Sequence, residues 1–67
     1  MIPTVGQNEI EMRDLAIELM QANYKAADNC AKEYAKSGDV QMRNAAKGHL
    51  QLAEVWRVRA RQHGANV

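Results

Sequence analysis

This 67-residue chain lacks the cross-links that usually hold small domains together. Cys30 is the only cysteine, so no internal disulfide can form. His49 and His63 are the only histidines, and no Cys/His cluster offers the four ligands of a structural zinc site. A single core of this size supplies only a few kcal/mol. The missing cross-links therefore point to self-association or to binding of a partner.

Other absences exclude whole classes of protein. No apolar run approaches the ~18–20 residues of a membrane span, and no charged-then-apolar leader marks a secretion signal. With one unpaired cysteine, we expect a cytoplasmic protein without a membrane partner. No P-loop, glycine-rich dinucleotide loop, paired-carboxylate motif or Ser/His/Asp arrangement is present. The sequence thus favours a non-enzymatic protein with no cofactor, no metal site and no catalytic residues.

The residues that are present predict an all-α fold built from one helical hairpin. Residues 1–7 form an N-terminal arm, and Asn8 with Glu11 has the spacing of a capping box. Apolar residues then recur every three or four positions, which predicts a helix over residues 8–36 and a second over residues 40–63. A turn at residues 37–39 contains Gly38 and Asp39, suited to ending one helix and capping the next. So short a connection makes the helices antiparallel.

Each predicted helix carries more apolar surface than one partner helix can cover. The inner stripe of the first contains Met12, Leu15, Ala16, Leu19, Ala22, Ala26, Ala27, Cys30, Ala31 and Tyr34. That of the second contains Met42, Ala45, Ala46, His49, Leu50, Leu52, Ala53, Trp56 and Ala60. Further apolar residues lie beside them, namely Ile10, Ile17, Met20, Tyr24, Val55 and Val58. We therefore expect the hairpin to assemble into a dimer or a higher helical-bundle oligomer.

Charge is unevenly distributed along the chain. Residues 1–36 hold six acids and four bases, and residues 37–67 hold two acids and five bases. Arg57, Arg59 and Arg61 form the densest basic run, which either complements the negative helix end or binds an anion at a subunit junction. The net charge of +1 lacks the broad basic surface used for duplex binding, so a nucleic-acid-associated regulator is the weakest functional reading.

The role of His49 has two interpretations from the sequence. Cys30 and His49 are a conceivable nucleophile and base, but both lie on inner stripes, where a small hydrophobe and a satisfied core histidine are the ordinary interpretation. Alternatively, Lys47, Gly48, His49 and Gln51 group donors and acceptors around a glycine where another backbone or a ligand can approach closely.

The aromatic residues also have two readings. Tyr24 suits a subunit seam, or it stacks on a base while Lys25 or Lys47 meets a phosphate. Trp56 is expected to anchor an interface.

The run Lys47-Gly48-His49-Leu50-Gln51, followed by Arg59-Ala60, resembles the second helix of phage cyclic-oligonucleotide sponges. These helical hairpins form oligomers that counter the CBASS and Thoeris immune systems of bacteria by holding cyclic nucleotides between subunits. The resemblance covers about a dozen positions of the second helix. The family usually has arginine then threonine where Lys47 and Gly48 stand, and lysine cannot reproduce a planar guanidinium contact.

The resemblance implies a phage protein of immune evasion that acts in the host cytoplasm and sequesters a small anionic ligand, a cyclic nucleotide. His49 and Gln51 would shape the site between subunits, Lys47 would face a phosphate, and Arg59 would be a basic contact at the helix end. Tyr24, with Lys25 beside it, would stack on a base. The alternative is a small helical protein-interaction module that inhibits or regulates a host protein.

Overall fold

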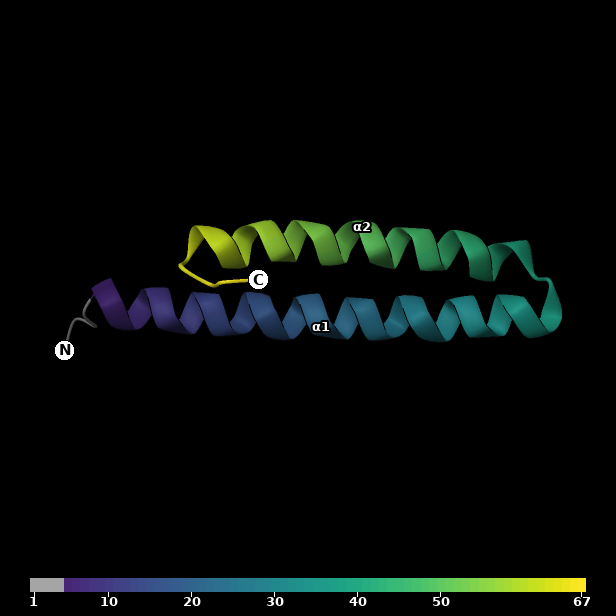
Figure 1. The fold of residues 1–67 in the computed structure, drawn as a ribbon, viewed down its shortest axis with the longest axis horizontal. Coiled ribbons are helices and arrows are strands. Elements are labelled where there is room, and N and C mark those ends of the chain that lie inside the picture. The colour runs from purple at the N-terminus through teal and green to yellow at the C-terminus, as the bar shows by residue number, and fades with distance from the viewer. Residues whose placement is uncertain (1–4) are drawn as a thin grey trace.

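The computed structural model describes residues 5–67, with side chains from residue 8, as two antiparallel helices (Figure 1). Helix α1 spans Val5–Ser37 and helix α2 spans Val40–Gln62. The predicted all-α hairpin is confirmed. The rod measures 52 × 19 × 14 Å, and within the described residues neither helix is long and apolar enough to cross a membrane.

The start of α1 differs from the prediction. The helix begins at Val5, so Asn8 lies inside it and does not cap it. A single glycine in a first turn costs only about 1 kcal/mol relative to alanine, which explains why Gly6 does not delay the helix. Residues 1–4 of the predicted arm lie outside the described residues.

The turn matches its prediction closely. Gly38 adopts a positive φ of 70° and donates its backbone N–H to the Tyr34 carbonyl at 2.8 Å. Asp39 caps α2, because its carboxylate accepts a hydrogen bond from the backbone N–H of Gln41 at 2.9 Å. At the far end Gly64 also has a positive φ, 96°. Glycine at these positions avoids the steric cost of the left-handed conformation.

The seam between the helices is made largely of alanine. Buried apolar residues among those described are Ala16, Met20, Ala27, Ala46, Ala53 and Ala60. Ala46, Ala53 and Ala60 recur every seven residues, the repeat of antiparallel helices packed along one stripe. Because alanine has only one side-chain carbon, this stripe lets the backbones approach closely. Met20, expected beside the inner stripe of the first helix, is buried in this seam.

Most large apolar side chains remain outside the seam. Side chains about half exposed are Ile10, Met12, Leu15, Val40, Leu50, Leu52, Val55 and Val58. Met12, Leu15, Leu50 and Leu52 were expected on the inner stripes, but the alanines occupy that position instead. One hairpin therefore covers little of the apolar surface that its sequence provides.

Candidate functional site

His49 of α2 makes a polar contact with α1 within the seam between the helices. Its Nδ1 lies 3.0 Å from the side-chain oxygen of Asn23, and the Asn23 amide nitrogen donates to the Leu19 carbonyl at 2.8 Å. Because an amide oxygen can only accept, the contact requires His49 to carry its proton on Nδ1. Both residues are half-buried. His49 thus has a structural partner inside the hairpin.

The same register separates His49 from Cys30. With Asn23 level with His49, Cys30 lies level with Met42, seven residues from His49 along α2. At 1.5 Å per residue this is about 10 Å. The hairpin does not assemble the conceivable nucleophile–base pair.

Tyr24 takes part in a polar cluster on one face of the hairpin. Its hydroxyl donates to Glu54 Oε1 at 2.6 Å, and Arg57 lies 3.5 Å from the same oxygen. The hydrogen bond to the Glu54 carboxylate raises the pKa of Tyr24 above its ordinary 10.0. The same bond lowers the pKa of Glu54 below its ordinary 4.5, with a smaller contribution from the Arg57 charge.

These shifts predict how the cluster responds to pH. The raised pKa of Tyr24 favours the folded state below pH 10.0, and this contribution is lost as the pH rises through the folded value. The lowered pKa of Glu54 favours the folded state above pH 4.5, and this contribution is lost as the pH falls through the folded value. Tyr24→Phe is expected to move the Glu54 pKa back up toward 4.5, as measured by carboxyl NMR titration.

Tyr34→Phe is the matched control for this prediction. Tyr34 lies near the turn, where Arg43 approaches its ring to 6.0 Å. We expect this variant to leave the Glu54 titration unchanged. An unchanged Glu54 pKa in Tyr24→Phe would show that the phenol does not hold the carboxylate in solution.

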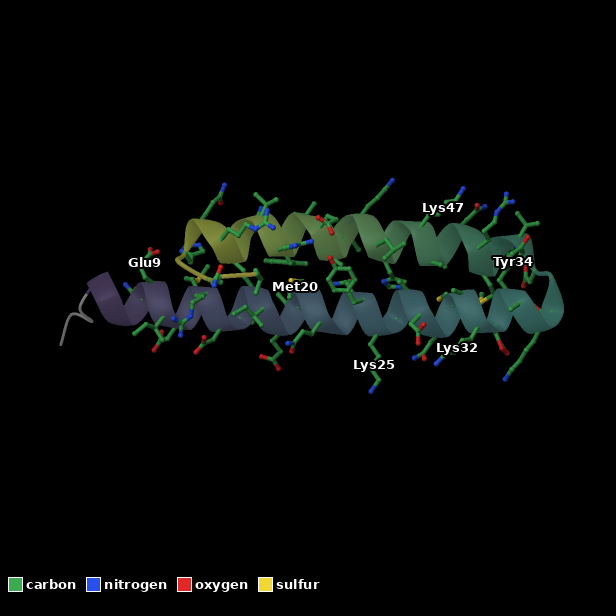
Figure 2. All side chains as sticks on the ribbon, viewed as in Figure 1. Glu9, Met20, Lys25, Lys32, Tyr34 and Lys47 are labelled. Carbon is green, nitrogen blue, oxygen red and sulfur yellow. The ribbon has the colours of Figure 1, made fainter. Side chains whose placement is uncertain are left out.

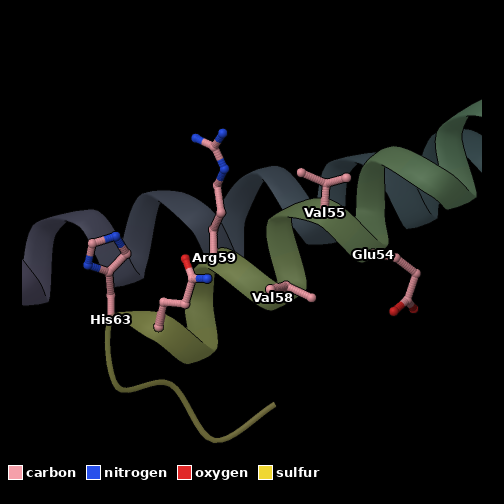
Figure 3. Close-up of a pocket in the computed structure, with 6 residues that line it drawn as sticks. Glu54, Val55, Val58, Arg59 and His63 are labelled. Carbon is pink, nitrogen blue, oxygen red and sulfur yellow. The ribbon is translucent and has the colours of Figure 1, made fainter.

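A wide depression lies on the side of α2 that faces away from α1 (Figure 3). Its volume is about 600 Å³, within the range of small-molecule sites. The lining residues are Glu54, Val55, Val58, Arg59, Gln62 and His63. All come from α2 or the residue after it, so the depression is open to solvent and has no opposite wall within the hairpin.

Two basic side chains define the character of this depression. The Arg59 guanidinium lies 5.2 Å from the centre of the Trp56 ring, a cation–π distance. His63 Nδ1 lies 2.9 Å from the Glu9 carboxylate of α1. Arg59 therefore combines a positive charge with an aromatic neighbour, while His63 is engaged with an acid.

The hairpin distributes the other predicted site residues over different surfaces. Lys25 and Lys47 are exposed and point away from opposite edges of the hairpin (Figure 2). Gln51 is exposed on α2, and Tyr24 is bonded to Glu54. Of the predicted set, Arg59 lines the depression. A single chain does not bring the set together.

Two residues that make polar contacts between the helices, Asn23 and Glu54, were not singled out from the sequence. Asn23 was overlooked, although it stands seven residues after Ala16 and seven before Cys30, so it is polar on an otherwise apolar stripe. Glu54 likewise does not belong to any pattern described from the sequence. Its link to Tyr24 joins residues 30 positions apart. No local pattern encodes such a pair.

Comparisons with other proteins add no assignment: no protein-family model matches the chain, and neither the curated proteins nor the solved structures yield a match.

Proposed function

We propose that this protein is a non-enzymatic binding protein that works as an assembly of hairpins. The exposure of its large apolar side chains carries the proposal. Among residues 8–67, five alanines and Met20 are buried, while eight larger apolar residues stay about half exposed. Burying apolar surface contributes roughly 25 cal/mol per Å². Association with other copies is the direct way to gain this stabilisation in a chain without cross-links.

We further propose that the assembly sequesters a small anionic ligand of the cyclic nucleotide class. The depression around Arg59 supports this, because it offers a guanidinium for a phosphate beside apolar Val55 and Val58. It is large enough for such a ligand and open on one side. A second subunit would supply the missing wall, which agrees with a ligand held between subunits.

A thermal-shift panel of cyclic mono- and dinucleotides tests the ligand. A ligand at 100 times its Kd stabilises the folded state by about 2.7 kcal/mol, which raises Tm by the order of 10 °C in a domain of this size. Arg59→Ala is expected to weaken binding about tenfold, since charged hydrogen bonds contribute roughly 1.5–3 kcal/mol. At the same ligand concentration, stabilisation then falls to about 1.4 kcal/mol.

Lys32→Ala is the matched control. Lys32 is an exposed base near the turn, paired with Asp28 at 2.9 Å, so its loss removes one positive charge without touching the depression. Its ligand-induced shift should equal that of the unmodified protein. If no cyclic nucleotide raises Tm, or if both variants lose the shift equally, the ligand proposal is rejected.

The alternative, a module that regulates a host protein, rests on the same exposed apolar residues. It predicts that the purified protein is monomeric and associates only with its target. Native mass measured over a range of concentrations separates the two, because self-association requires a concentration-dependent dimer or larger species.

A further inference from the structure

The two faces of the hairpin that flank the alanine seam differ sharply. Each residue advances about 100° around a helix, so residues directly before and directly after the seam positions lie on opposite sides. Tyr24 and Glu54 directly follow the seam residues Asn23 and Ala53, and they hydrogen-bond across one face. In an antiparallel hairpin the residues that precede the seam positions must therefore share the other face.

This second face, here named the leucine face, carries only two charged residues, Glu33 near the turn and Arg59 near the open end. On α1 it holds Leu15, Leu19, Ala22 and Ala26, followed near the turn by Asn29 and Glu33. On α2 it holds Gln41 near the turn, then Ala45, Gly48, Leu52, Val55 and Arg59. The corresponding positions of the tyrosine face include Ile17, Gln21, Tyr24, Asp28, Lys47, Leu50, Glu54, Arg57 and Arg61. The leucine face is thus the surface better suited to burial against another protein.

Side-chain size on the leucine face changes along the rod. Toward the open end lie Leu15, Leu19 and Leu52, with Trp56 under Arg59 at the seam. Toward the turn lie Ala22, Ala26, Ala45 and Gly48. Large side chains make the face protrude at the open end, and small side chains leave it recessed toward the turn. Such a surface is complementary to itself when one copy is turned end to end against another.

Gly48 is unexplained by the hairpin alone. A side-chain carbon added there would meet nothing within 4 Å, and its φ is not in the left-handed region. Neither close packing within the chain nor backbone conformation requires this mid-helix glycine. Close approach of an atom from outside the chain does account for it.

We propose that a second copy of this chain docks antiparallel on the leucine face, to form a two-fold symmetric four-helix dimer. The inference rests on the proposed self-association and specifies its surface and orientation. The Asn23–His49 contact sets the register of the hairpin. Met20, three residues before Asn23, is therefore level with Leu52, three residues after His49. A two-fold axis at this level places Leu19 opposite the partner subunit's Ala22, and Trp56 opposite the partner subunit's Gly48. Away from the axis, raised residues therefore fit onto low ones on both helices, and at the axis Leu52 meets the partner subunit's Leu52.

The same axis also pairs Leu15 with the partner subunit's Ala26, and Arg59 with the partner subunit's Ala45. The parallel arrangement does the opposite. It places α1 against the partner's α2, so leucines meet Leu52 and Trp56 at one end while alanines face Gly48 at the other. That packing overcrowds one end and leaves a gap at the other, and both are unfavourable.

Charges along the outer edge of α1 agree with the antiparallel arrangement. Glu11 and Glu18 lie toward the open end, and Lys25 and Lys32 lie toward the turn. In the antiparallel dimer each glutamate comes within two or three residues of the level of a lysine of the partner's α1. Complementary charges at the rim favour one register over others.

The dimer would also complete the depression around Arg59. Residues 44–48 of one copy come alongside residues 56–60 of the other, so the partner subunit's Ala45 and the partner subunit's Gly48 border the depression beside Arg59.

Ala22→Leu tests the surface, and Ala35→Leu is its control. Both replace an exposed alanine of α1 with leucine, but Ala35 lies on the tyrosine-face side. Sedimentation equilibrium should show that Ala22→Leu raises the dimer dissociation constant at least about tenfold, because a leucine fills the low half of the face. Ala35→Leu should change it less than about twofold. Equal effects of the two variants would overturn the surface.

A spin label tests the orientation. With Cys30→Ala removing the native thiol, Lys36→Cys places one label near each turn. In the antiparallel dimer these labels lie at opposite ends of the rod, roughly 45 Å apart at 1.5 Å per residue. A distance under about 25 Å would overturn the antiparallel orientation while leaving self-association intact. A monomer at every concentration would overturn both this inference and the proposed assembly.

Discussion

Ala53→Leu is expected to lower the free energy of unfolding by about 3 kcal/mol, the upper end of what overpacking a core costs. Ala53 has no exposed surface and sits between Ala46 and Ala60 on the seven-residue repeat of the seam. A leucine there has no space unless the helices separate, which would also stretch the Asn23–His49 contact. Chemical denaturation followed by circular dichroism, at one fixed protein concentration, measures the change.

Ala35→Leu provides the matched comparison, since Ala35 is an exposed alanine of α1. It should change stability by less than about 0.5 kcal/mol, as surface substitutions usually do. If leucine at position 53 proves as harmless as leucine at position 35, the alanine repeat does not determine the distance between the helices.

His49→Ala is expected to cost about 2 kcal/mol, because it leaves the Asn23 oxygen without its partner in a partly buried seam. Asn23→Ala should cost a similar amount for the reciprocal reason. The double variant should cost less than the two single variants together, with a coupling energy of about 1 kcal/mol in a double-mutant cycle. Asn44→Ala, an exposed position on α2, serves as the control and should be nearly neutral.

Strictly additive losses would show that Asn23 and His49 act independently. A measured coupling would instead assign His49 a role in register, since a polar pair on an apolar seam opposes any sliding of one helix along the other. That role is separate from the ligand contact that its position beside Lys47 and Gly48 suggests. Comparing ligand binding and stability in His49→Ala distinguishes the two.

Regular features of the sequence were enough to predict the elements of this fold. Apolar spacing gave both helices, and Gly38 followed by Asp39 located the turn and the cap of α2. These are local interactions, satisfied within a few residues of each other, so they are visible along the chain. The start of α1 at Val5 was missed because a weak helix signal before Asn8 was outweighed by a good capping residue.

Tertiary packing alone decided which stripe of each helix became the seam. Leu15 and Leu52 have the same helical spacing as the alanines beside them, yet the structure buries Ala16 and Ala53 and leaves both leucines about half exposed. Periodicity identifies a broad apolar arc, and only the packing of two helices selects the line of closest approach within it.

The candidate site was likewise predictable only in part from the sequence, and the rest depended on the tertiary structure. The sequence identified Arg59 as a basic contact, but its place over Trp56 and beside an open depression depended on the fold. The Tyr24–Glu54 and Asn23–His49 contacts join residues 30 and 26 positions apart, which no local pattern specifies. The sequence by itself determined two helices, one turn and too few cross-links for a chain of this length. The tertiary structure decided that alanines meet inside and leucines face outward, because close helix contact favours small side chains and leaves the large ones for another surface.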